Sequence, residues 1–166
     1  VLELQRMLGE SGDMELSVGT NHVRCQIGEI RFTSKLIDGR FPEYSRVIPQ
    51  NANRIIDADR GTLRQSLQRT VILSNEKYRG IRLNIKPGVL TLQAHNPEQE
   101  EAEDQIEVTY AGEEIEIGFN VTYLLDALSA IDTERVNIAL TDANSSCLIT
   151  AATADGARYV VMPMRL

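Results

Sequence analysis

Hydrophobic and polar residues alternate along most of this chain with the period of a β-strand. In the last third, Ile115, Ile117 and Phe119 alternate with acids and a glycine, which predicts a strand. Asn120 is a typical helix N-cap, and the residues after it have an apolar helical face. Two alternating runs around a turn and a last strand over 159–164 complete a unit of strand, helix, hairpin and strand. Its predicted core positions are Leu124, Leu125, Leu128, Ile131, Val136, Ile138, Leu140, Cys147, Ile149 and Ala151.

The same unit occurs in the middle of the chain. A strand over 54–59 precedes a helix that Asp59 or Thr62 caps, and a hairpin turns at Pro87-Gly88. A fourth strand is predicted through Ile106, Val108 and Tyr110. Strands with one apolar face predict an α+β fold, in which helices cover one face of antiparallel sheets.

A third, partial copy opens the chain. It lacks its first strand, and residue 1 already lies in the predicted helix, so we expect the chain to be the C-terminal part of a longer, repetitive protein. Residues 38–53 contain glycine and proline without clear periodicity and are predicted to be a linker between domains. We expect residues 47–166 to form a complete domain and residues 1–46 to form half of the preceding one.

Acidic residues are concentrated in one stretch. The 166 residues include 17 basic and 24 acidic side chains, a net charge of −7, and residues 98–116 contain nine of the acids and no Lys or Arg. The rest of the chain has 17 basic and 24 − 9 = 15 acidic residues, a net charge of +2. Tight DNA binding by phosphate neutralisation needs a larger basic surface. We interpret Glu98–Asp104 as a solvated or partner-facing acidic loop, or as protection of a sheet edge.

The composition and motifs favour a soluble, cytoplasmic, non-enzymatic protein. Hydrophobic residues make up 42% of the chain, but no apolar run is long enough to span a membrane. No phosphate-binding loop, nucleophile elbow, zinc motif or CxxC is present. We expect His22 and His95 to be structural or surface residues, and Cys25 and Cys147 to be buried, inert thiols. A divalent cation at the acidic stretch is an alternative, although its spacing matches no calcium loop.

The C-terminal segment, YVVMPMRL, is unusually apolar for a chain end. A core strand accounts for one alternating face, but the other face carries Val160, Met162 and Met164. Because exposed methionines adapt to varied ligands, this pattern favours a peptide-binding groove.

Several long strings resemble one family, the bacterial DNA sliding clamp, which is the beta subunit of the DNA polymerase III holoenzyme. They cover essentially the whole chain: SKLIDGRFPEYSRVIP (34–49), ILSNEKYRGIRL (72–83), NPEQEEAE (96–103), EIGFNVTYLLDAL (116–128) and YVVMPMRL (159–166). The resemblance implies the DNA-clamp fold, with two copies of the unit in each of three domains. It places residues 1–46 in the second half of the middle domain and residues 47–166 in the third domain.

The resemblance also implies a function without covalent chemistry or a cofactor. A head-to-tail dimer closes into a ring, encircles duplex DNA and tethers the replicative polymerase as a processivity factor. The clamp loader and repair factors share its partner groove through a short linear motif. Candidates for loose contacts with DNA phosphates are the helical residues Arg6, Arg64 and Arg69.

Two sets of site residues are carried over by matching strings. The groove would be lined by Pro42, Arg46, Val47, Tyr78, Asn120, Tyr123, Ser146, Val160, Val161, Met162, Pro163 and Met164. Tyr78 stands where relatives carry Phe, a departure that keeps the ring. The dimer contact would consist of Ile72, Leu73, Glu98, Glu100, Glu101, Glu103 and Asp104. Since the first domain supplies the opposing side of that contact, we expect this chain alone not to form the ring.

Two other classes remain open. A stand-alone peptide-binding module without DNA is consistent with the terminal methionines and the negative charge. A metal-dependent hydrolase that uses the acidic cluster is the second and weaker alternative.

Overall fold

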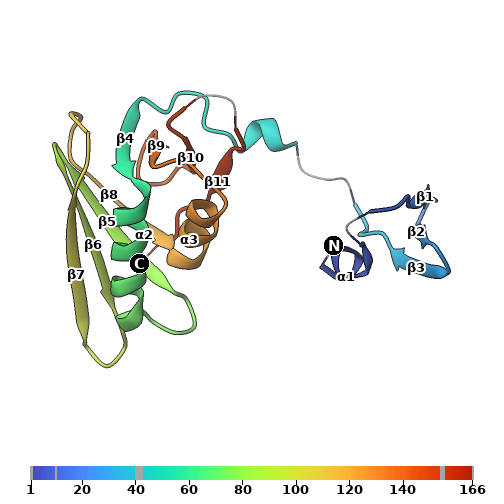
Figure 1. Ribbon diagram of the computed structural model, residues 1–166. Coiled ribbons are helices and arrows are strands. Elements are labelled where there is room, and N and C mark those ends of the chain that lie inside the picture. The colour runs from blue at the N-terminus through green and yellow to red at the C-terminus, as the bar shows by residue number, and fades with distance from the viewer. Residues whose placement is uncertain (1, 10, 40–42, 154–155, 166) are drawn as a thin grey trace. The chain divides into compact units, whose positions relative to one another are not determined.

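The computed structural model describes residues 2–9, 11–39, 43–153 and 156–165. The chain packs as two units, Val1–Pro42 and Glu43–Leu166, which are described separately (Figure 1). The division falls within the predicted linker, and the short 3-10 helix η1 (Tyr44–Arg46) belongs to the second unit.

The first unit has three strands, one short helix and almost no core. Helix α1 (Leu2–Met7) is followed by an antiparallel sheet of β1 (Glu15–Val18), β2 (His22–Ile27) and β3 (Ile30–Lys35). Among the described residues of this unit, Cys25 is the one buried side chain, whereas Leu16 and Val18 are 53% and 68% exposed. A small sheet needs a hydrophobic face packed on something else for stability. The unit therefore lacks the burial that an independent domain requires.

The second unit contains the predicted repeat twice, and this prediction is confirmed. The first copy consists of β4 (Arg54–Asp59), α2 (Arg60–Thr70), η2 (Val71–Leu73), β5 (Gly80–Lys86), β6 (Val89–His95) and β7 (Glu101–Glu107). The second copy consists of β8 (Ile115–Asn120), α3 (Val121–Ser129), β9 (Arg135–Leu140), β10 (Cys147–Ala151) and β11 (Tyr159–Val161).

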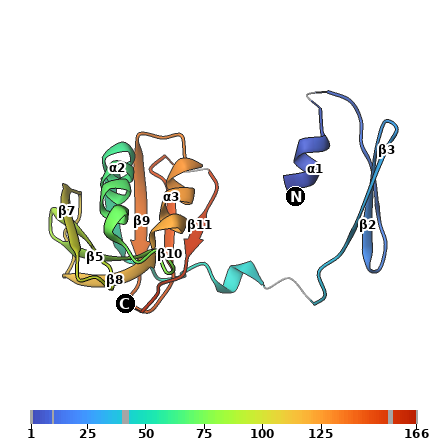
Figure 2. The ribbon, with the colours of Figure 1, turned by 90° about the horizontal axis from the view of Figure 1, so that it is seen from below.

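The two copies exchange their opening strands. One sheet has the order β7-β6-β5-β8, and the other has the order β11-β10-β9-β4, so each opening strand pairs with the hairpin of the other copy. All the pairs are antiparallel. Helices α2 and α3 lie side by side in both ribbon views (Figures 1 and 2). This exchange makes the second unit one domain rather than two tandem modules.

Both helices begin at the capping residues that the sequence predicts. The Asp59 carboxylate accepts a hydrogen bond from the backbone N–H of Thr62 (2.7 Å), and the Asn120 side-chain oxygen accepts one from Thr122 (2.9 Å). Hydrogen bonds from the Thr62 side chain and backbone lower the pKa of the Asp59 carboxyl. Each cap satisfies a backbone donor that the first helical turn leaves unpaired.

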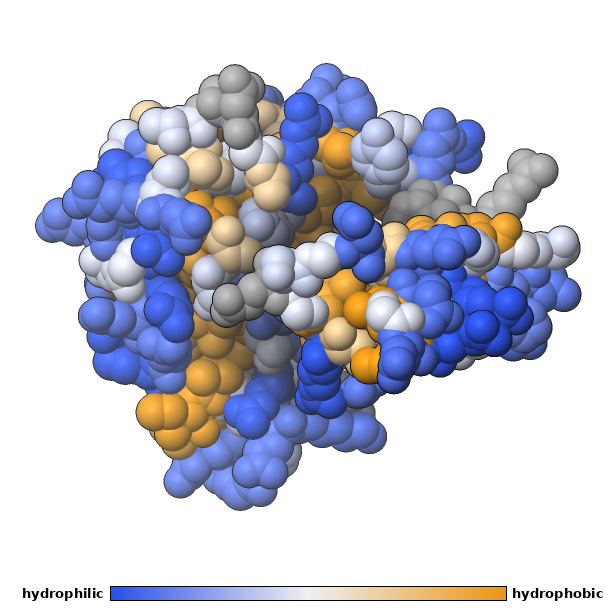
Figure 3. Space-filling view, turned by 45° about the vertical axis from the view of Figure 1, so that its right-hand side comes forward, coloured by the Kyte–Doolittle hydropathy of each residue, from blue (hydrophilic) through white to orange (hydrophobic). Residues whose placement is uncertain are grey.

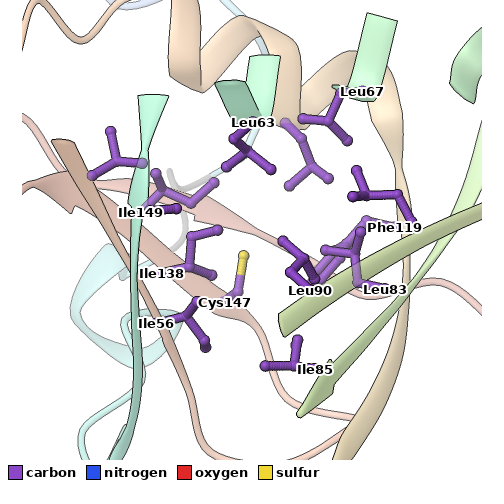
Figure 4. Close-up of a cluster of buried hydrophobic side chains, with 14 of the residues drawn as sticks. Ile56, Leu63, Leu67, Leu83, Ile85, Leu90, Phe119, Ile138, Cys147 and Ile149 are labelled. Carbon is purple, nitrogen blue, oxygen red and sulfur yellow. The ribbon is translucent and has the colours of Figure 1, made fainter. Parts of the chain in front are cut away.

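One hydrophobic core lies between the helices and the two sheets. Strands β5 and β6 alternate buried and partly exposed residues along their length, so each sheet turns one face inward. Leu63 and Leu67 of α2 contribute to this core together with strand residues such as Ile56, Leu83 and Ile149 (Figure 4). The predicted burial of Cys25 and Cys147 is confirmed.

Two strand predictions need correction. Strand β7 runs from Glu101 to Glu107, so Glu101–Asp104 lies in the edge strand of its sheet and is not a loop. Val108 and Tyr110, which were predicted for this strand, follow it. The alternation of apolar residues that predicts a strand appears only near the end of β7. Most of its exposed positions carry carboxylates, which protect the edge of a sheet from pairing with another chain. The last strand ends at Val161 rather than at residue 164, since Pro163 has no N–H to donate to a ladder.

Candidate functional site

The two repeats close differently onto the neighbouring sheet, and the candidate site lies where closure is incomplete. After β7, Thr109 and Asp57 of β4 exchange two backbone hydrogen bonds (3.0 and 2.8 Å). After β11, the corresponding link is one hydrogen bond of 2.9 Å, from the Met164 N–H to the carbonyl of Gly118 in β8. The C-terminal segment thus crosses from one sheet to the other without forming a ladder.

This crossing leaves apolar side chains at the surface. Val161 is 5% exposed and packs in the core, whereas Met162 is 62% exposed. Val160, Pro163 and Met164 are half-buried. The predicted alternation of burial therefore holds only from Val161 to Met162, because the strand ends at Val161 and Pro163 and Met164 are both half-buried.

The loop before β5 is tied to the start of α3. The Asn120 side-chain N–H donates to the Tyr78 carbonyl (3.3 Å), and the Val121 backbone N–H donates to the Arg79 carbonyl (2.9 Å). Arg79 has a positive φ of 48°, which turns the chain into β5. Asn120 therefore has two roles, as the cap of α3 and as an anchor of Tyr78, whose ring is 54% exposed.

A second tie fixes the chain that leads into the unit. The Ser146 hydroxyl donates to the Val47 carbonyl (2.8 Å), directly before β10. Val47 is 42% exposed, and Arg46 forms an exposed ion pair with Glu43 (2.7 Å). Tyr123, in the first turn of α3, is 59% exposed. Pro42, which is also predicted for the groove, lies outside the described residues.

These side chains form a mixed apolar and polar surface, which we call the tail surface. It comprises Val47, Tyr78, Tyr123, Met162 and Met164, held by the ties of Ser146, Asn120 and Gly118. Apolar patches interrupt an otherwise largely hydrophilic molecular surface (Figure 3). Exposed methionine and aromatic side chains on a fixed backbone are suited to binding an apolar peptide segment.

The predicted dimer residues fall into two groups. Ile72, Leu73, Glu98 and Glu100 line one cavity of about 540 Å³, and Ile72 is 75% exposed. Glu101 and Glu103 follow along the exposed face of β7. Asp104 lies on the other face of that strand, where its carboxylate accepts hydrogen bonds from Arg69 (2.6 and 3.0 Å).

The three candidate DNA contacts differ in their surroundings. Arg6 pairs with Glu3 on α1 (2.8 Å), and Arg69 is held by Asp104. Burial alone would raise the pKa of Asp104, but the hydrogen bonds and positive charge of Arg69 hold it below its ordinary value. Arg64 is exposed on α2 and makes no ion pair with the described residues. Of the two candidate arginines on α2, Arg64 is therefore the less constrained.

The described residues show little that could support chemistry. They contain no group of three or more His, Cys, Asp or Glu side chains that could hold a metal ion. Burial raises the pKa of the Cys147 thiol to about 12, which disfavours the thiolate. Among the same residues, no helix is long and apolar enough to cross a membrane.

Several residues that position the site are not among those predicted from side-chain patterns. Gly118 and Arg79 contribute only backbone atoms, so no side-chain signal marks them. Asn75 accepts hydrogen bonds from the N–H groups of Lys77 and Tyr78 (2.9 and 3.1 Å). Its turn was detectable in principle, because Asn commonly bonds the backbone two residues on.

Comparisons with known proteins are consistent with this geometry. The family described as "DNA polymerase III beta subunit, C-terminal domain" matches residues 45–165, and the one described as "DNA polymerase III beta subunit, central domain" matches residues 1–43. The beta sliding clamps of Pseudomonas aeruginosa and Escherichia coli K12 are 53% and 50% identical to the chain. Both alignments cover 100% of this chain and 46% of the relative. The chain thus spans about half the length of these relatives.

Solved structures agree with the fold. A crystal structure of the Pseudomonas aeruginosa sliding clamp with a ligand matches with a TM-score of 0.88 and 54% identity, over 99% of this chain and 45% of that one. The Bartonella birtlesii clamp bound to griselimycin matches with a TM-score of 0.86 and 35% identity, over 99% of this chain and 44% of that one.

Proposed function

Because the chain belongs to the DNA polymerase III beta subunit family, the beta sliding clamps, we propose that it is part of a processivity factor of DNA replication. The whole protein would encircle duplex DNA as a dimeric ring in the cytoplasm and tether the replicative polymerase, the clamp loader and repair factors. It would perform no covalent chemistry and need no cofactor. The tail surface is the observation that supports partner binding.

Topology rather than affinity would hold such a protein on DNA. The chain has a net charge of −7, and of the two arginines proposed on α2, Arg69 is already bonded to Asp104. Because affinity from counterion release grows with the number of phosphates neutralised, so few contacts give weak binding. A closed ring needs no strong contact and leaves the protein free to slide. Tethering then raises the effective concentration of the polymerase at the primer end.

We further propose the assignment of the two units. Residues 1–46 would be the second half of the middle domain, and residues 47–166 would be the third domain. The exposed apolar side chains of the first unit support this, because they need a covering segment from the missing half. Ile72, Leu73 and the acids around residue 100 would contact the first domain of another subunit, so this chain alone would not close a ring.

The partner site would accept a short apolar motif on the tail surface. We propose a titration of isotopically labelled chain with a peptide of the Gln-Leu-x-Leu-Phe type, followed by methyl NMR. The expected shifts are at Val160, Val161, Met162 and Met164, and Met162→Ala should weaken binding. The matched control is Met14→Ala. It removes an exposed methionine side chain of the first unit that does not belong to the proposed groove.

Three results separate the explanations. Shifts confined to the named methyl groups would support the groove. If neither this chain nor the complete gene product bound the peptide at millimolar concentration, the proposed function would be wrong. Binding by the complete gene product alone would support a groove that includes residues before this chain.

A further inference from the structure

A cavity of about 350 Å³ opens beside the tail surface, wholly within the second unit. Tyr78 and Met164 of the tail surface contribute to its lining, together with His95, Asn96, Pro97 and Arg165. Ligand pockets commonly measure ~300–1,000 Å³. This cavity is therefore large enough for one or two side chains but not for a helix.

Two hydrogen-bonded turns hold the cavity open. In the first, the Asn75 side-chain oxygen accepts from the Lys77 and Tyr78 N–H groups (2.9 and 3.1 Å). In the second, Asn96 accepts from the Glu100 N–H (2.9 Å) and donates to its carboxylate (2.7 Å). A preformed site spends less of its binding free energy on ordering loops.

The lining is suited to a carboxylate. Arg165 supplies a guanidinium, and the His95 imidazole has an N–H donor in either protonation state. None of the residues that line the cavity is Asp or Glu, although the chain as a whole has a net charge of −7. Arg165 makes no ion pair within the part of the chain that the structure describes. An incoming acid would therefore displace no ion-pair partner of Arg165 among the described residues.

The neighbouring surface limits how far an acid can reach. An adjoining cavity shares Asn75, Asn96 and Pro97 with this one, but Glu98 and Glu100 also line it. Like charges repel, so a carboxylate is favoured beside Arg165 and disfavoured past Pro97. Glu101 also faces His95 across the β6–β7 pair, and Glu101 and Glu103 line a further cavity that includes His95, so the favourable position for a single carboxylate is beside Arg165.

We propose that this cavity is an accessory subsite that binds an acidic side chain flanking the apolar motif of a partner peptide. The proposal rests on the proposed function of the tail surface, because Tyr78 and Met164 belong to both. It adds a specificity rule: among peptides with the same apolar motif, those with an adjacent Glu or Asp bind more tightly than those with Ala or Lys.

Peptide affinities measured by fluorescence anisotropy test this rule. The probes are five peptides with one common Gln-Leu-x-Leu-Phe core: an Ala-flanked reference, and versions with Glu or Lys directly before or after the core. The cavity lies in one unit of the 166-residue chain, so this chain is used if it binds the Ala reference, and the complete gene product is used otherwise. One Glu peptide should bind about two- to fivefold more tightly than the Ala reference in 0.1 M salt. The gain should shrink in 1 M salt, where the Debye length falls from about 10 to about 3 Å.

Variants locate the effect. Arg165→Gln should abolish the gain from Glu while leaving the affinity for the Ala peptide unchanged within twofold. His95→Leu should reduce the gain by a smaller factor, and it provides a second test if Arg165→Gln disturbs the tail. Arg158→Gln, which removes the same charge outside the cavity, should keep the full gain.

The outcomes distinguish the two proposals. If the Glu, Ala and Lys peptides bind equally, or if Arg165→Gln keeps the full gain, the accessory subsite is refuted and the tail surface is unaffected. If Met162→Ala leaves the affinity for every peptide unchanged, the proposed partner groove is refuted as well.

Discussion

Asn120 is the residue at which helix formation and the candidate site depend on the same side chain. Its oxygen caps α3 through the Thr122 N–H (2.9 Å), and its amide donates to the Tyr78 carbonyl (3.3 Å). Asn120→Ala removes both bonds, whereas Asn120→Asp keeps the capping oxygen and removes the donor. Comparing the two variants therefore separates the contribution of the helix cap from the contribution of the hydrogen bond to Tyr78.

The structure gives the expected magnitudes. Loss of an N-cap costs about 1 kcal/mol. The longer bond to Tyr78, in an exposed loop, contributes about 0.5 kcal/mol or less. With a urea m-value of about 2 kcal/mol/M, Asn120→Ala should lower the unfolding midpoint by about 0.5–0.75 M. Asn120→Asp should lower it by about 0.25 M or less.

Urea titration followed by the methyl NMR signals of Leu124 and Leu128 measures this, because both side chains are buried in α3. Peptide affinity gives the second readout. Asn120→Asp places a carboxylate beside the Tyr78 carbonyl and should weaken peptide binding despite near-normal stability. If Asp destabilised the domain as much as Ala, or if Ala left the midpoint unchanged, the assignment of the cap as the dominant contribution would be refuted.

Three further predictions concern stability and reactivity. Leu67 is 1% exposed, and Leu67→Ala should lower the free energy of unfolding in urea by about 2–5 kcal/mol. Ile72 is 75% exposed, and Ile72→Ala should lower it by less than about 0.5 kcal/mol. Equal losses would contradict the packing. The Asp59 carboxyl has a folded-state pKa below its ordinary value of 3.8, so its stabilisation is present above pH 3.8 and is lost as the pH falls through the lower folded value. Asp59→Asn should therefore reduce the loss of unfolding free energy between about pH 4 and 2, and an unchanged acid profile would refute this role. Iodoacetamide labelling, measured by mass spectrometry, should modify Cys25 before Cys147, because the first unit has almost no core. Faster labelling of Cys147 would contradict this.

Local signals in the sequence predict the elements well, because their causes are local. Asp59 and Asn120 cap the helices that follow them, and the alternation through Ile81, Leu83 and Ile85 marks a buried strand face. The acidic strand β7 was less predictable. Three of its four exposed positions carry carboxylates, and Ile106, near its end, is its one buried residue.

Long-range features could not be read from the residues themselves. The exchange of β4 and β8 between repeats depends on how the two copies pack, and either pairing satisfies the same alternation. The link from Met164 to Gly118 joins backbone groups that nearly every residue type has, and the positive φ of Arg79 occurs at a residue type that does not favour it, so neither leaves a signal in the sequence. The tail surface was accessible to prediction because Val160, Met162 and Met164 leave an apolar pattern where a half-buried strand would be polar. The cavity beside it was not, since His95 and Arg165 are far apart in the chain and meet only in the fold.

Retention on DNA tests the central claim most directly. The complete product of the gene that encodes these residues would be loaded by its clamp loader onto a nicked circular plasmid, and bound protein would be counted by gel filtration before and after a single cut. A clamp held by topology should stay on the circle in high salt and leave once the DNA is linear. Equal retention on circular and linear DNA, with loss from both as salt rises, would show binding by charge and contradict the account.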